Sequence, residues 1–130
     1  MPYLQLEINK NYPAATKQLL AKRMGEIYSG VMIADVKRVT VTIRELGEGS
    51  VWRCSEGEPW PAAILMCDVR AGRTKEVREE LAKKLIAVCN EILELEINQL
   101  NVEFTQHNGD EMYHQWMGHL SENWSPDGNN

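Results

Sequence analysis

The sequence is poor in the features that mark membrane, secreted and metal-binding proteins. Only three of its 130 residues are cysteines, and none are spaced as C-x-x-C, so neither a disulfide framework nor a thiolate zinc site is expected. No segment approaches the ~18 apolar residues that a membrane helix needs. The first ten residues include Glu7 and Lys10 and lack the apolar core of a signal peptide. We therefore expect a cytoplasmic protein in which Cys67 and Cys89 are buried, reduced thiols.

Positive charge is also scarce. Fourteen Lys and Arg face nineteen Asp and Glu, which gives a net charge of −5 without any block of like charges. Nucleic acids and anionic membranes require a basic face, so neither is expected as the main partner. The 43% hydrophobic and 25% charged content is close to the globular average, which excludes disorder, collagen and coiled coils. The length predicts a single domain over residues 1–130, because domains commonly have ~100–150 residues.

The first half of the chain alternates between the periods of a strand and a helix. Apolar side chains alternate in Tyr3–Asn9, which predicts a half-buried strand. Residues 13–31 follow a helical period, with Pro13 suited to the first turn and Gly30 to the end. Val39 to Arg44 alternates again and is rich in β-branched residues, so it predicts a second strand.

The second half repeats this order. Residues 45–61 contain glycines and prolines typical of a loop. The apolar run 62–69 predicts a buried strand, and Thr74 is a suitable N-cap for a helix over 74–93. Leu100, Val102 and Phe104 alternate in a fourth strand. From His107 onward the chain predicts a loop, a short turn and a tail.

These elements predict an α+β fold built from two pseudo-symmetric β-α-β units, about residues 2–45 and 61–106, followed by the tail 107–130. The two units should form one four-stranded sheet with both helices on one face. The strands within each unit should be parallel. The other face would then be an uncovered apolar surface, which predicts oligomerisation.

Pro2 opens the first strand. In one interpretation this proline only blunts a sheet edge. In the other, removal of Met1 leaves Pro2 as a terminal secondary amine. The reference pKa of a terminal amine is ~7.7–8.0, and nearby cations lower it, so the amine could act as a general base or acid near neutral pH.

Arg70 and Arg73 flank a predicted turn at Ala71 and Gly72. Arginine binds carboxylates through two parallel hydrogen bonds, and the following helix N-terminus adds partial positive charge. In the alternative interpretation, both arginines are solvated and pair with Glu76 or Glu80. Surface pairs of that kind contribute only ~0–1 kcal/mol.

Other polar residues admit two roles each. Tyr28 adjoins the apolar stripe of the first helix, so it is a partly buried aromatic or else a hydrogen-bond donor. Glu103 alternates away from Val102 and Phe104, so it faces outward or else acts as a second base near Pro2. His107, His114 and His119 lie close to Asp110 and Glu111, but their spacings match no zinc pattern, and no metal or cofactor is expected. The four tryptophans are expected at subunit contacts or at a pocket rim: Trp52, Trp60, Trp116 and Trp124.

Together these motifs resemble the tautomerase superfamily, and most closely its cis-3-chloroacrylic acid dehalogenase group. The resemblance covers about residues 2–120 and rests on Met1-Pro2 before a strand, the doubled β-α-β units and the segment 69–74, with Ala21-Lys22, Glu45, Val102 and Phe104 also matching. It implies a β-α-β fold, a homotrimer and a catalytic amino-terminal Pro2. It also implies that Arg70 and Arg73 bind the carboxylate of the substrate.

The chain departs from the dehalogenase pattern at three positions. Tyr28 stands where that group has a histidine, and Glu103 stands where it has a tyrosine. Near the water-activating glutamate of that group, this chain has Tyr113 and His114. Malonate semialdehyde decarboxylase, another relative, uses an aspartate, for which Asp35 is only a loose candidate.

The resemblance therefore favours a cofactor-independent tautomerase acting on a small 2-oxo or enol carboxylate such as phenylenolpyruvate. Pro2, Arg70 and Arg73 would carry this reaction, with Tyr28, Glu103 and His114 as further catalytic candidates. One alternative is a hydratase or dehalogenase of cis-3-haloacrylates, or a related decarboxylase. Another is a non-catalytic binding oligomer on the same scaffold, because the dehalogenase residues are replaced at positions 28, 103 and 114.

Overall fold

The computed structural model describes residues 2–109 and 111–120. Its centre is a four-stranded sheet in the order β2-β1-β5-β6. The strands are β1 (Tyr3–Ile8), β2 (Thr40–Glu45), β5 (Ala63–Arg70) and β6 (Leu100–His107). β1 is parallel to β2, β5 is parallel to β6, and β1 and β5 are antiparallel. The predicted fold class is confirmed, as is parallel pairing within each β-α-β unit.

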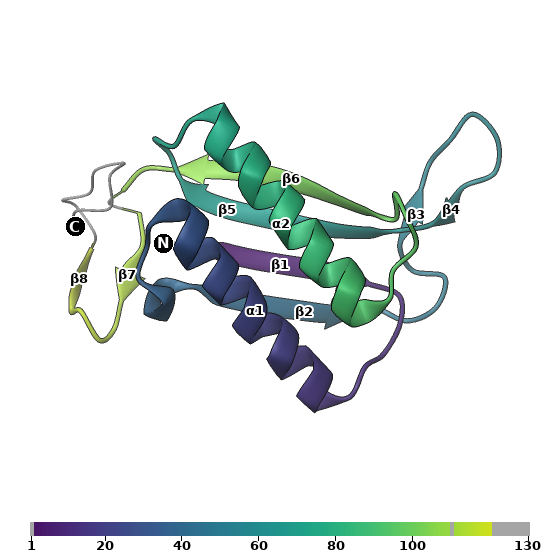
Figure 1. Ribbon diagram of the computed structural model, residues 1–130, viewed down its shortest axis with the longest axis horizontal. Helices are drawn as coiled ribbons and strands as arrows, with labels where there is room; N and C mark the ends of the chain where they lie inside the picture. The colour runs from purple at the N-terminus through teal and green to yellow at the C-terminus, as the bar shows by residue number, and fades with distance from the viewer. Residues whose placement is uncertain (1, 110, 121–130) are drawn as a thin grey trace.

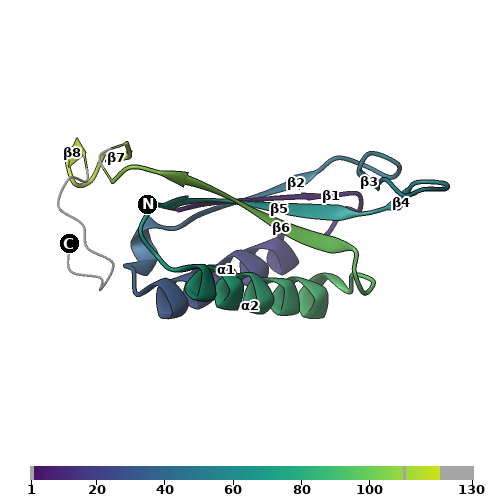
Figure 2. The ribbon, with the colours of Figure 1, turned by 90° about the horizontal axis from the view of Figure 1, so that it is seen from above.

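Two helices cover one face of this sheet, as expected (Figures 1 and 2). They are α1 (Ala14–Met32) and α2 (Lys75–Leu93). Thr74 is the N-cap of α2, and its hydroxyl accepts a hydrogen bond from the Val77 N–H. The expected helix over residues 13–31 agrees with α1 to within one residue at each end, but Gly30 does not end it. The helix continues to Met32 because that side chain is buried in the core, and Ile33 then ends it in the left-handed region at φ 52°.

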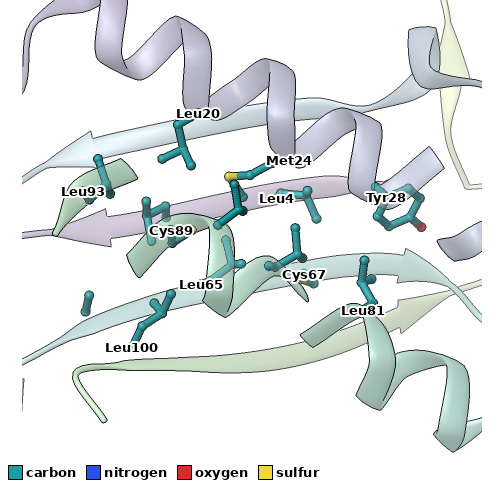
Figure 3. Close-up of a cluster of buried hydrophobic side chains, with 14 of the residues drawn as sticks. Leu4, Leu20, Met24, Tyr28, Leu65, Cys67, Leu81, Cys89, Leu93 and Leu100 are labelled. Carbon is teal, nitrogen blue, oxygen red and sulfur yellow. The ribbon is translucent and has the colours of Figure 1, made fainter. Parts of the chain in front are cut away.

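The core lies between the sheet and the helices (Figure 3). Every second residue of β1 and β5 points into it, including Leu4, Leu6, Leu65 and Cys67. The helices contribute residues one turn apart, which are fully buried, among them Leu20, Met24, Leu81 and Leu85. Cys67 and Cys89 are buried free thiols, as predicted, and burial raises the pKa of each to about 12. Among the described residues, no helix is long and apolar enough to cross a membrane.

Short elements extend both ends of the sheet. At one end, β3 (Trp52–Arg53) and β4 (Trp60–Pro61) form a hairpin inside the predicted loop 45–61. The Asn9 side chain ties this segment to β1, because its Oδ1 accepts from the Val51 N–H and its Nδ2 donates to the Val51 carbonyl. At the other end, η1 (Val36–Arg38) leads into β2, and β7 (Tyr113–His114) pairs with β8 (His119–Leu120). The N-terminus lies at this second end (Figure 1).

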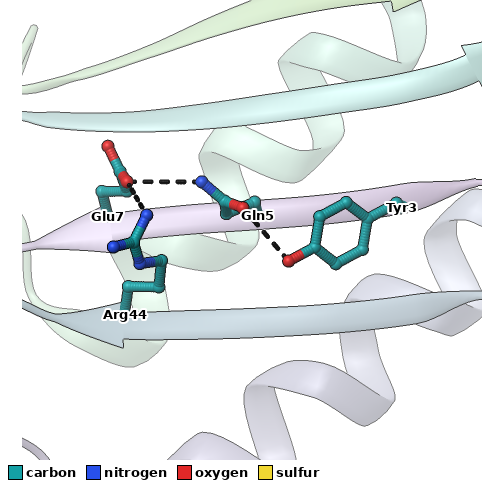
Figure 4. A network of polar contacts seen from close by, with 4 residues as sticks. All are labelled: Tyr3, Gln5, Glu7 and Arg44. Atoms are coloured by element: carbon teal, nitrogen blue, oxygen red, sulfur yellow. Dashed lines mark hydrogen bonds and ion pairs between the residues drawn. The ribbon is translucent and has the colours of Figure 1, made fainter.

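The face of the sheet opposite the helices is uncovered, but it is not apolar as expected. Tyr3 donates to Gln5, Gln5 donates to Glu7, and Arg44 forms an ion pair of 2.7 Å with Glu7 (Figure 4). By strand alternation, the other side chains of β2, β5 and β6 on this face are also polar, except for Ile64 and Met66 on β5. The prediction fails because it assumed that an uncovered face of a sheet in an oligomer is apolar. Here a hydrogen-bonded network occupies it.

Candidate functional site

Pro2 directly precedes β1 and is buried. Its carbonyl accepts a hydrogen bond of 3.3 Å from the Thr40 N–H at the start of β2. On the other side of β1, Tyr3 pairs with Asp68 near the end of β5. The sheet order therefore places Pro2 between the start of β2 and the end of β5.

Arg70 ends β5, and Arg73 stands just before the N-cap of α2. The turn between them requires Gly72, whose φ is 129°. Both arginines are buried, with exposed fractions of 1% and 9%. Arg70 Nη2 donates to the Gly109 carbonyl at 3.0 Å, and Arg73 Nη2 donates to the Met32 carbonyl at 2.8 Å. The interpretation of two solvated arginines is therefore wrong.

Tyr28 lies on α1 beside these arginines and is fully buried, more than the sequence predicted. Burial raises the pKa of its phenol well above the usual range, although the positive charges of Arg73 and Arg70 act in the opposite direction. The phenol is consequently protonated at neutral pH. Its oxygen has no hydrogen-bond partner among the described residues, so the proton is available to a bound anion.

Arg38 was not singled out from the sequence. It ends η1 and stands two residues before Thr40, whose N–H binds the Pro2 carbonyl. The pKa of Arg70 is lowered by burial and then by the nearby charges of Arg38 and Arg73. Arg38 therefore belongs to the same cationic cluster, which we define as Arg38, Arg70 and Arg73. Parallel pairing of the first two strands was the signal that could have found it.

His114 lies on β7, close to this cationic cluster. Burial lowers the pKa of its imidazole, and the charges of Arg38 and Arg70 lower it further. Its ring also contacts Trp116 at a centroid distance of 5.8 Å, and Lys37 Nζ lies 5.8 Å from the centre of the Trp116 ring. The β7-β8 hairpin thus places a neutral imidazole beside the arginines.

Glu103 is not part of this cluster. It is exposed on β6 and pairs with Met66, on the sheet face opposite the helices. Asp35 has a local role, because its Oδ1 accepts from the Lys37 N–H and caps η1. In residues 2–109 and 111–120, no group of three His, Cys, Asp or Glu side chains could hold a metal ion. Asp110 and Trp124 lie outside the described residues.

One cavity lies at the opposite end of the sheet from Pro2. Its volume is about 700 Å³, and its lining includes Ile8, Tyr12, Trp52 and Gln99. A second cavity of about 500 Å³ lies between α1 and the start of β2. Neither is lined by Pro2 or the arginines.

The arrangement has the chemistry of a small anion site. Guanidinium groups in a buried place bind carboxylates more strongly than they do at the surface. The protonated phenol of Tyr28 adds a neutral hydrogen-bond donor. If Met1 is removed, Pro2 adds a terminal amine at the start of β1. Such a site can hold a carboxylate and move protons beside it.

Solved structures share this fold. N1, a member of the cis-3-chloroacrylic acid dehalogenase (cis-CaaD) family, superposes with a TM-score of 0.79 at 18% identity, over 92% of this chain and 84% of that one. A wild-type symmetric trimer of Q0 fused 4-OT gives 0.77 at 22% identity, over 92% and 94%. Pt0534 inactivated by 2-oxo-3-pentynoate gives 0.76 at 22% identity, over 92% and 94%. No family model and no curated protein match the sequence.

Proposed function

We propose that the protein is a cofactor-independent tautomerase that acts on a small 2-oxo or enol carboxylate such as phenylenolpyruvate. Pro2, once Met1 is removed, is the general acid and base, while Arg70 and Arg73 hold the substrate carboxylate. The observation that carries this proposal is that both arginines are buried close to the start of β1, which Pro2 directly precedes. The similarity of the fold to a protein inactivated by 2-oxo-3-pentynoate also supports a 2-oxo acid as substrate.

The charges around Pro2 suit this role. A terminal amine titrates at ~7.7–8.0 in the absence of neighbours. Arg38 ends η1, two residues before the start of β2, and Arg70 ends β5. Because β2 and β5 flank β1, the charges of both arginines disfavour a protonated amine. The amine of Pro2 would then exchange protons readily near neutral pH, which is the requirement for acid–base catalysis.

Arg70→Ala tests the proposal in protein freed of Met1. We expect kcat/KM for phenylenolpyruvate to fall by at least about 10-fold, because a hydrogen bond to a charged group contributes about 1.5–3 kcal/mol. Arg23→Ala is the matched control, since Arg23 is an exposed arginine that pairs with Glu91. Pro2→Ala should lower kcat instead. Full activity in both Arg70→Ala and Pro2→Ala would refute the mechanism.

Hydration of a 3-haloacrylate is the second candidate, and His114 favours it. Its lowered pKa keeps the imidazole neutral beside the arginines, where it could take a proton from water. Release of halide from cis-3-chloroacrylate, lost in His114→Gln but kept in His119→Gln, would support this activity. If neither substrate class reacts, a non-catalytic binding oligomer becomes the better account of the scaffold.

A homotrimer is part of the proposal. It is supported by the similarity to trimers of fused 4-OT. Large exposed side chains at both ends of the sheet, Trp52 and Trp116, support it as well, because aromatic residues are enriched at protein interfaces.

A further inference from the structure

Asp68, Thr105 and His107 form a hydrogen-bonded group on the uncovered face of the sheet. The Asp68 carboxylate accepts from the Thr105 hydroxyl at 2.9 Å and lies 3.1 Å from Nδ1 of His107. The His107 side chain is only 11% exposed. Its Nε2 is buried and has no hydrogen-bond partner within the described part of the chain.

The contact with Asp68 fixes the protonation pattern of this imidazole. A carboxylate only accepts hydrogen bonds, so Nδ1 of His107 carries the proton that it donates. In the neutral ring, Nε2 is then the basic nitrogen, and its lone pair is directed away from Asp68. Thr105 holds the same carboxylate oxygen and so restricts its rotation. An oriented imidazole with one unused basic nitrogen is the arrangement that proton transfer requires.

The sheet places this imidazole directly beside Arg70. His107 is the register partner of Arg70 in the parallel β5-β6 pair, and strand alternation puts both on the same side as Asp68. Pro2 lies on the other neighbour of β5, one residue before the Tyr3–Asp68 pair. On β1, Pro2 is therefore level with Val69, the residue before Arg70, while His107 is level with Arg70 on β6. Each neighbouring strand is about 4.7–4.9 Å away.

We propose that His107, oriented by Asp68, is a second proton-transfer residue of this site, acting on the substrate oxygen while Pro2 acts on carbon. The inference rests on the proposed tautomerase function. With the carboxylate bound to Arg70, we expect the C2 oxygen of an enol carboxylate to lie toward β6 and its C3 carbon toward β1. Two proton-transfer groups on opposite sides match the two positions at which a keto–enol conversion exchanges a proton.

The step balances without a cofactor. Nε2 of His107 accepts the proton of the enol hydroxyl, and the electrons of the O–H bond form the C=O bond. The electrons of the C=C bond form a C–H bond with the proton that the Pro2 ammonium delivers to C3. The imidazolium then loses a proton to water and the Pro2 amine gains one, which restores both groups. The reaction is an isomerisation with no net proton uptake.

The charged groups next to His107 lie on β5. Asp68 contacts its Nδ1, and Arg70 is its register partner. Loss of a proton-transfer group at this position should lower kcat and leave KM nearly unchanged, a separation that a purely structural role would not produce.

The test is His107→Gln in protein freed of Met1, assayed by the ketonisation of phenylenolpyruvate. We expect kcat to fall about 100-fold, as for loss of a general acid or base. KM should stay within about threefold, because Arg70 is retained. His119→Gln is the matched control, since His119 is exposed and its Nδ1 lies 2.8 Å from the carbonyl of its neighbour Leu120. Asp68→Asn should also lower kcat, and ¹⁵N NMR should show a shift from the Nδ1–H to the Nε2–H tautomer of His107.

The outcomes separate the two proposals. If His107→Gln keeps kcat within twofold while Arg70→Ala and Pro2→Ala are impaired, this inference is wrong and the tautomerase proposal stands. If the wild-type protein without Met1 is inactive, both are wrong. If His107→Gln does not fold, the wild-type protein is titrated with phenylglyoxylate, a 2-oxo acid that cannot enolise. The ¹⁵N shift of Nε2 in His107 should then move, and an unchanged shift overturns the inference.

Discussion

At the scale of single residues, the ring and the hydroxyl of Tyr28 have different roles, one in packing and one in the proposed chemistry. Its ring is part of the core, beside Met24 and Cys67 (Figure 3). Its hydroxyl is buried near Arg70 and Arg73 without a hydrogen-bond partner in the described residues. A buried hydroxyl in that state costs about 1–3 kcal/mol of stability, and a bound anion that accepts its proton would offset this cost.

Tyr28→Phe should therefore affect function and stability in opposite directions. We expect the free energy of unfolding to stay the same or rise, because the ring is kept and the unsatisfied hydroxyl is removed. We expect kcat/KM for phenylenolpyruvate to fall about 10-fold. Chemical denaturation and steady-state kinetics measure the two effects, with Tyr3→Phe on the uncovered face as control. A destabilised variant with full activity would make Tyr28 a packing residue only.

A site residue can be predicted from the sequence when its neighbours in space are also close to it in the sequence. Arg70 and Arg73 flank a turn that the sequence itself marks, so their proximity could be predicted. Arg38 joins them through the pairing of β2 with β1 and of β1 with β5. The first pairing was predicted, but the order of the strands in the sheet was not. From the sequence, His107 was considered together with His114 and His119 as a possible metal ligand. Its hydrogen-bond partner, Asp68, is 39 residues away in the sequence, so no local pattern indicates this contact.

At the scale of elements, strand and helix periods predicted the sheet and both helices, while their ends depended on tertiary contacts. α1 passes Gly30 because Met32 is buried and its carbonyl accepts from Arg73. A cation at a helix C-terminus is favourable to the helix dipole. Arg73 therefore also connects the end of α1 to the start of α2, a contact that a local sequence pattern could not have predicted.

Glu45, at the end of β2, should make the stability of the fold depend on acid pH. The hydrogen bond from Lys17 lowers the pKa of this carboxyl, and the Tyr12 N–H lowers it further. A carboxyl whose pKa is lower in the folded state than in the unfolded state stabilises the fold at pH values above its unfolded pKa, which is about 4.3 for Glu. This stabilisation is lost as the pH falls through the folded-state pKa. Glu45→Gln should thus be less stable than the wild type at pH 7, and the difference should shrink below about pH 4.3.

Thermal unfolding of both proteins between pH 3 and pH 7 measures this difference. Glu91→Gln is the matched control, because Glu91 pairs with Arg23 at an exposed position and exposed pairs contribute little. A Glu45→Gln difference that does not change with pH would show that the carboxylate charge is not what stabilises this end of β2.

At the scale of the whole molecule, an acidic chain has one strongly cationic end. The net charge is −5, yet Arg38, Arg70 and Arg73 gather at the end of the sheet that carries Pro2. A small carboxylate fits such a buried cluster, whereas a polyanion would need an extended basic surface. The opposite end contains the cavity of about 700 Å³ beside the exposed Trp52.

We predict that light scattering gives about three times the chain mass of 14.9 kDa. The polar network of Tyr3, Gln5, Glu7 and Arg44 on the uncovered face suits a hydrated surface inside an assembly rather than an apolar contact. The exposed Trp52 and Trp116 would instead supply the apolar contacts at the ends of the sheet. A monomer mass across micromolar concentrations would exclude the trimer.

The central claim is that the amine of Pro2 carries out proton transfer on a carboxylate held by the arginines. It is tested most directly by the rate of phenylenolpyruvate ketonisation in two preparations of this chain, one retaining Met1 and one without it, each verified by intact mass. We predict activity only without Met1, with a fall of at least about 100-fold when the amine is blocked. Equal rates in the two preparations would contradict the account.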